Sequence, residues 1–138
     1  MNQVFTHDQL IRFSHCDPAG IVYFPRFFDL AHATMEDWFC LALGQSLPEL
    51  IRQRRIGTPT VSVQCEFAKP LRMGDTLRFE LRVLRLGNAS VQLAYSGKKD
   101  GVEHLKMVQT IAFMALDGGS ATPIPDDLRE RIEQYLAG

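Results

Sequence analysis

The residues of this chain whose types could carry chemistry lie at positions 15–25, which read HCDPAGIVYFP. Asp17 places a carboxylate in a turn-forming segment between apolar residues. Pro25 occupies a position typical of the first residue of a helix, where the missing amide hydrogen costs nothing. The start of a helix presents unpaired amide groups, which stabilise negative charge developing on a carbonyl oxygen. A carboxylate facing such a polarised carbonyl could hydrolyse an activated acyl group.

A structural role for Asp17 is the simpler interpretation on spacing alone. An Asp before a Pro in a loop is commonly a turn former or a helix cap, because its side chain bonds to nearby backbone amides. Gly20 is similarly explained by a turn that needs unusual dihedral angles. Cys16 adjoins Asp17 without a paired base, so it is interpreted as a small, inert residue.

The helix that would follow this segment is predicted over residues 25–43. Apolar residues recur there at spacings of three and four, and Gly44 follows as a C-terminal cap. The stripe is too apolar for an exposed helix, so it must pack on a broad apolar surface. Its members are Phe27, Phe28, Ala31, Met35, Trp38, Phe39 and Ala42.

The remaining elements indicate one sheet. Residues 4–13 are predicted as a first strand and residues 46–54 as a short helical turn. From residue 57 the apolar period changes to two, which predicts strands beginning near positions 61, 77, 91 and 103. Tight turns between them imply antiparallel neighbours. A short helix over 126–136 completes a single α+β domain, residues 1–138, in which the sheet wraps the apolar helix.

Composition excludes several classes of function. The net charge of −1 does not indicate the basic surface that binds nucleic acid. Three dispersed cysteines and four histidines lack the spacing of metal ligands, so no metal site is expected. The chain shows neither a signal peptide nor an apolar run long enough to span a membrane. A cytoplasmic protein is therefore expected, and the open sheet edges favour a homo-oligomer.

The string at positions 15–25 closely resembles the signature of the 4-hydroxybenzoyl-CoA thioesterase family. Residues 57–59, which read GTP before a long strand, are similar to that family as well, and the layout agrees over nearly the whole chain. The resemblance implies a hotdog fold, in which a five-stranded antiparallel sheet wraps a long central helix. It also implies homodimers, often paired into homotetramers, with active sites at subunit interfaces.

The resemblance assigns roles to the residues of the string. Asp17 would attack the thioester carbonyl or activate water to do so, and the sequence leaves nucleophile and general base open. The backbone amide of Phe24 would bind the carbonyl oxygen. Gly20 would let the backbone approach the substrate, and Tyr23 would line the acyl pocket.

Four further residues are assigned to substrate binding. His15 is a rival general base, although a loop histidine that orients its neighbours is the favoured interpretation. His32 could reach the acyl pocket or be satisfied by a structural hydrogen bond. Thr58 belongs to the second similar segment. Arg85 is the one cation beside the turn at 86–89, where better-known relatives carry paired arginines for the nucleotide, so carriers other than CoA stay open.

The predicted function is hydrolysis of an aromatic or short-chain acyl-CoA to a free acid and CoA. No cofactor is expected, since coenzyme A is part of the substrate. Two alternatives remain: a hotdog hydratase or dehydratase, which the Asp17 string disfavours, and a non-catalytic module that binds acyl-CoA.

Overall fold

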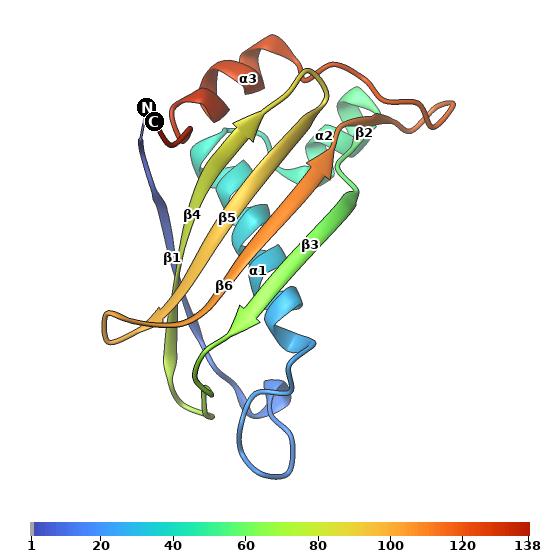
Figure 1. Ribbon diagram of the computed structural model, residues 1–138. Coiled ribbons are helices and arrows are strands. Elements are labelled where there is room, and N and C mark those ends of the chain that lie inside the picture. Colours follow the sequence, from blue (N-terminus) through green and yellow to red (C-terminus); the bar gives the residue numbers. More distant parts are fainter. Residues whose placement is uncertain (1) are drawn as a thin grey trace.

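The computed structural model describes residues 2–138, in which five strands form one antiparallel sheet of order β1-β4-β5-β6-β3 (Figure 1). This confirms the predicted five-stranded sheet. Two short strands, β2 (Ile56–Gly57) and β7 (Met114–Ala115), pair separately. The long strands are β1 (Phe5–Leu10), β3 (Thr60–Phe67), β4 (Thr76–Leu86), β5 (Ser90–Lys99) and β6 (Val102–Ala112).

The principal helix crosses one face of this sheet (Figure 1). It consists of α1 (Arg26–Asp37) and a π-helical continuation, Trp38–Ala42, so the single α-helix predicted to Leu43 is not what forms. The Leu43 amide donates a hydrogen bond to the Trp38 carbonyl, five residues earlier. This wider turn brings the consecutive rings of Trp38 and Phe39 into the core together, where their centroids lie 5.4 Å apart.

Two shorter helices, α2 (Leu47–Arg54) and α3 (Asp126–Glu133), complete the described chain. Ser46 caps α2 through the Glu49 amide, while the Glu49 carboxylate accepts from the Ser46 amide. A 3-10 turn, Phe13–His15, precedes the segment that resembles the family signature. None of the helices in residues 2–138 is long and apolar enough to cross a membrane.

The core lies between α1 and the sheet. Strand β4 alternates as predicted, and its inward side chains are fully buried. Each such side chain contributes about 1.5–3 kcal/mol through removal of its surface from water. The inward residues of β4 are Leu77, Phe79, Leu81 and Val83, and those of α1 include Phe27, Leu30 and Met35.

The connection between β3 and β4 differs from the prediction of a tight turn between neighbours. Strand β3 pairs with β6, whereas β4 lies between β1 and β5, so residues 68–75 run across the end of the sheet. Leu71 in this connection is fully buried, and its carbonyl accepts the Val22 amide at 2.9 Å. The segment thus supports the loop that carries Asp17.

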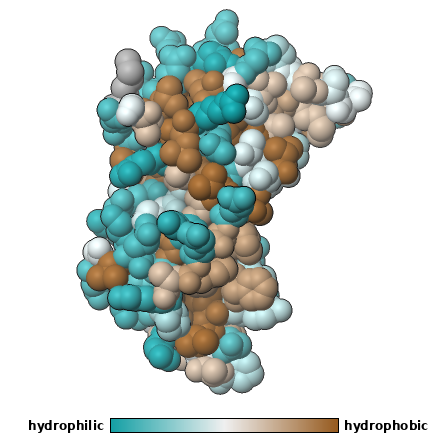
Figure 2. All heavy atoms as spheres, viewed as in Figure 1, coloured by the Kyte–Doolittle hydropathy of each residue, from teal (hydrophilic) through white to brown (hydrophobic). Residues whose placement is uncertain are grey.

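Strand β3 is an edge strand whose apolar residues are only partly covered. Val61, Val63 and Phe67 are 61%, 42% and 46% exposed, although their alternation predicts an inward face. Figure 2 shows apolar residues reaching the surface among polar ones on this side of the molecule. An apolar edge of this kind is a template for pairing with another strand.

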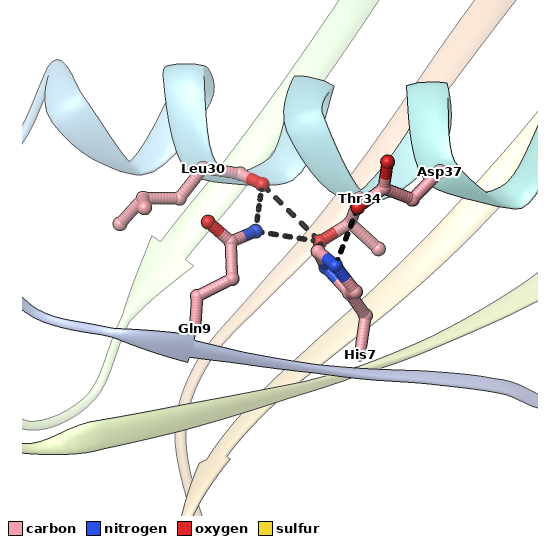
Figure 3. A network of polar contacts seen from close by, with 5 residues as sticks. All are labelled: His7, Gln9, Leu30, Thr34 and Asp37. Atoms are coloured by element: carbon pink, nitrogen blue, oxygen red, sulfur yellow. Dashed lines mark hydrogen bonds and ion pairs between the residues drawn. The ribbon is translucent and has the colours of Figure 1, made fainter.

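A polar network holds α1 on the other edge of the sheet (Figure 3). Gln9 of β1 donates to the Leu30 carbonyl at 2.5 Å and to the Thr34 hydroxyl at 2.9 Å. His7 lies 3.1 Å from the same hydroxyl and 2.6 Å from the Asp37 carboxylate. These contacts fix the position of α1, and with it the segment before its first turn.

Candidate active site

A narrow loop, residues 16–22, carries the predicted catalytic carboxylate. Cys16 and Val22 form an isolated antiparallel bridge at its base. The Asp17 amide donates to the Ile21 carbonyl at 3.0 Å, and the Gly20 amide donates to the Asp17 carbonyl at 2.9 Å. Gly20 has φ 82°, and a Cβ built there meets nothing within 4 Å. Gly20 is therefore needed for its backbone conformation rather than for space within the chain.

Only one oxygen of the Asp17 carboxylate is hydrogen-bonded within the loop. Its Oδ1 accepts the Ala19 amide hydrogen at 2.9 Å, which is the turn-forming bond expected of such an aspartate. Its Oδ2 has no hydrogen-bond partner among residues 2–138, and the side chain is partly exposed. One oxygen thus orients the group while the other is available to a substrate.

The backbone before α1 leaves one amide unused. Tyr23 donates its amide to the His15 carbonyl at 2.9 Å, and Arg26 donates to the Tyr23 carbonyl at 2.8 Å. The Phe27 amide is bonded to the Phe24 carbonyl at 3.1 Å. Within the described part of the chain the Phe24 amide itself has no acceptor. It is a free donor at the positive end of the α1 dipole.

The His15 ring is hydrogen-bonded within the 3-10 turn to which it belongs. Its Nδ1 accepts the Arg12 amide hydrogen at 2.9 Å. Burial lowers the pKa of His15, and the nearby charges of Arg12 and Arg26 lower it further. Both observations favour a neutral ring that orients the loop, which was the favoured interpretation.

We expect His15 to make stability depend on pH. Because its folded pKa lies below the ordinary value of about 6.5, the unfolded state binds more protons as the pH falls past that value. The free energy of unfolding should therefore decrease between pH 7.5 and pH 5, and decrease less in His15→Gln, which keeps an acceptor that does not titrate. Urea denaturation across this range measures the difference. Parallel curves for the two proteins would contradict the assignment.

Two hollows follow the groove between α1 and β3. One, of about 270 Å³, begins beside Phe24 and includes Phe27, whose ring centroid lies 5.4 Å from that of Phe67. Tyr23 lies just outside, with its ring 5.8 Å from Phe24, and is 53% exposed. The second hollow, of about 360 Å³, is lined by Phe28, Asp29, Ala31, His32, Thr60, Val63, Met107 and Gln109.

His32 lines this second hollow, and its role in an acyl pocket stays a prediction. Its ring also lies 3.3 Å from the Glu36 carboxylate, one turn further along α1. Asp17 lines neither hollow. One chain therefore contains an apolar groove and an Asp17 loop that are not joined into a closed pocket.

Thr58 and Arg85 lie far from Asp17 within the chain. Thr58 precedes β3 and Arg85 is near the end of β4, while the Asp17 loop lies at the opposite end of the sheet (Figure 1). The predicted substrate-binding set is thus divided between two ends of the molecule. A single copy brings together only the residues of positions 15–25.

Sequence reasoning missed Gln109 and Tyr95. Gln109 occupies an inward position of β6 between Met107 and Ile111, and is 6% exposed. Tyr95 is 2% exposed, and its hydroxyl donates to Gln109 Oε1 at 2.5 Å. A polar residue at an inward strand position was the available signal, because buried polar groups need partners.

Residues 11–132 match a family described as the thioesterase-like superfamily. The chain belongs to this superfamily. It is 30% identical over 123 residues to the 1,4-dihydroxy-2-naphthoyl-CoA hydrolase of Thermosynechococcus vestitus, covering 88% of this chain and 84% of the relative. The prediction of a thioester hydrolase is confirmed by such relatives. Membership of the narrower 4-hydroxybenzoyl-CoA thioesterase family stays a prediction.

Solved structures of the superfamily share the fold. A thioesterase superfamily protein from Jannaschia sp. CCS1 superposes with a TM-score of 0.91 at 27% identity, covering 100% of this chain and 96% of its own. A 1,4-dihydroxy-2-naphthoyl-CoA thioesterase from Synechocystis gives 0.87 at 22% identity, covering 94% and 96%. The thioesterase-like hotdog fold is thereby established for this chain.

Proposed function

We propose that this thioesterase hydrolyses acyl-CoA thioesters with Asp17 as its catalytic carboxylate. The observation that carries the proposal is that one carboxylate oxygen of Asp17 and the amide of Phe24, both on the segment that enters α1, have no hydrogen-bond partner among residues 2–138. The amide would hold the thioester oxygen, where negative charge develops as the carbonyl carbon is attacked. The name of the 30% identical relative, a CoA thioester hydrolase, supports CoA as the carrier.

Two chemical routes use these groups. In the first, an Asp17 oxygen attacks the carbonyl carbon, the C–S bond breaks with release of CoA thiolate, and water then hydrolyses the mixed anhydride. In the second, Asp17 takes a proton from water as the water oxygen attacks, and the thiolate leaves directly. Both yield a carboxylic acid and CoA, and both require an ionised Asp17.

Aromatic acyl groups are the proposed substrate class, with short-chain acyl groups as the second candidate. The rings of Phe27 and Phe67 line the first hollow, and the ring of Phe28 lines the second. Flat rings pack well against such walls. The relative named above acts on a naphthoyl thioester, which is also aromatic.

A homodimer formed by antiparallel pairing of two β3 edges would complete the site. The exposed apolar residues Val61, Val63 and Phe67 would be covered by the second copy. Because a two-fold axis reverses the direction of the partner strand, the Asp17 end of one copy would face the Thr58 end of the other. This arrangement would bring Thr58 of one copy toward Asp17 of the other, whereas β5 and β6 separate Arg85 of β4 from the paired edge. Further pairing into tetramers stays a prediction.

The proposed function is tested by assaying thiol release from benzoyl-CoA, substituted benzoyl-CoAs, acetyl-CoA and hexanoyl-CoA with the purified protein. We expect turnover of one class, with aromatic esters preferred. Hydrolysis of the same acyl groups only on an acyl-carrier protein would replace CoA as the carrier. Binding of acyl-CoA without any turnover, in a folded protein, would favour the binding module and overturn the proposal.

A further inference from the structure

A chain of three polar side chains runs from the core to the second hollow, the one of about 360 Å³. The buried Tyr95 hydroxyl donates to Gln109 Oε1 at 2.5 Å, and Gln109 Nε2 donates to Thr60 Oγ1 at 2.8 Å. Gln109 and Thr60 both line that hollow. The three residues come from the adjacent strands β5, β6 and β3.

The direction of these hydrogen bonds is fixed from the buried end. Burial raises the pKa of Tyr95, so the phenol keeps its proton and needs an acceptor. Gln109 Oε1 is its acceptor, which turns the amide nitrogen of Gln109 toward Thr60. The Thr60 oxygen accepts one of the two amide hydrogens. Its own hydrogen, and the second amide hydrogen of Gln109, have no acceptor among residues 2–138.

Much of the wall around these two hydrogens is apolar, although Asp29 and His32 also line the hollow. Phe28, Ala31, Val63 and Met107 form the neighbouring walls of the hollow. Gln109 is 6% exposed, so its donor costs free energy when a ligand removes its water without supplying an acceptor, whereas Thr60 is exposed in the single chain. A ligand with an oxygen at this place should therefore bind more tightly than a plain hydrocarbon of the same shape.

We propose that Thr60 and Gln109 determine specificity, binding a hydroxyl or keto oxygen on the acyl group, and that Tyr95 positions the Gln109 amide. The inference rests on the proposed acyl-CoA hydrolysis and names the kind of acyl group. The preferred substrates are aromatic thioesters with an oxygen on the ring, and unsubstituted rings of the same size are poorer substrates. A site built to bond such an oxygen discriminates against the analogue that lacks it.

The test compares kcat/KM for 2-, 3- and 4-hydroxybenzoyl-CoA with that for benzoyl-CoA. We expect the wild type to prefer at least one isomer by about 10-fold, the size of one well-formed hydrogen bond. Thr60→Val, which keeps the shape and removes the hydroxyl, should lower that preference several-fold, and Thr60→Ser should restore it. Thr110→Val makes the same change on the opposite face of the sheet, where Thr110 pairs with Ser62 and Gln92, and should alter nothing.

Tyr95→Phe tests the positioning role without touching the substrate. Without the phenol, the Gln109 amide is free to rotate, so the preference ratio should fall even where melting temperature and benzoyl-CoA turnover show a folded enzyme. An isomer preference that survives in Thr60→Val and Tyr95→Phe, or no preference in the wild type, overturns this inference. The thioesterase proposal would survive either result. If the wild type hydrolyses none of the esters, that proposal fails, and calorimetric binding of the four esters to wild type and Thr60→Val decides the inference instead.

Discussion

Asparagine at position 17 is expected to lower kcat on the order of 10³-fold while leaving substrate affinity near that of the wild type. The asparagine side chain still offers an oxygen to the Ala19 amide, which Asp17 Oδ1 accepts at 2.9 Å, so the loop keeps its shape. What disappears is the negative charge that, in the proposed mechanism, attacks the carbonyl or takes a proton from water. Steady-state kinetics and calorimetric binding of the same acyl-CoA measure the two quantities.

A matched control is Asp126→Asn, at the exposed first turn of α3. It removes one carboxylate charge at the far end of the chain and should retain wild-type kcat. Asp17→Asn with wild-type turnover would mean that Asp17 only forms the turn. Loss of affinity and melting temperature together with kcat would instead indicate a collapsed loop, and the catalytic role would lose its support.

The second large effect is expected from a charge on the β3 edge. Val61 is 61% exposed in one chain, and the proposed dimer would bury it in both copies. Val61→Asp would then place two carboxylates in an apolar interface, each without a partner, and should raise the dimer dissociation constant by at least about 100-fold. Sedimentation velocity measures the change in mass. Because both copies would complete the proposed site, kcat/KM should fall in parallel.

Val102→Asp is the corresponding control. Val102 is 45% exposed where β6 begins, away from the β3 edge, so the same substitution should leave mass and activity unchanged. If a monomer of either the wild type or Val61→Asp is active, the active site does not depend on the dimer interface. Restoration of the dimer and of activity at high concentrations of Val61→Asp would support the link between them.

The fold was predictable where a single period governs a segment. The spacing of apolar residues from Phe27 to Phe39 places the principal helix, and the alternation in β4 separates its buried face from its polar one. The π turn at Trp38–Ala42 was not predictable, because it depends on how two adjacent rings fill the core. The path from β3 to β4 was mistaken because turn residues show where a chain bends, not which strand it then joins.

The site was predictable only in its local part. Asp17, Gly20 and Phe24 share one short string, and the structure gives each a distinct backbone role. The sequence around Thr58 and Arg85 does not indicate how far these residues lie from Asp17. In the fold they lie at the other end of the sheet. Tyr95, Gln109 and Thr60 belong to three strands that become neighbours only in the folded sheet. In the sequence, the alternation of apolar and polar residues makes Tyr95 and Gln109 look like ordinary core positions.

Mixed dimers test most directly whether Asp17 of one chain acts on a thioester whose acyl group lies in the second hollow of the other. Asp17→Asn keeps the groove, while His32→Trp fills the second hollow and keeps the carboxylate. Each variant alone should be inactive, because both of its sites are defective. Random mixing of the two should restore about a quarter of wild-type activity, since half of the dimers then hold one intact site. Activity no greater than the sum of the separate variants would contradict the account and place the carboxylate and the second hollow of one site in the same chain.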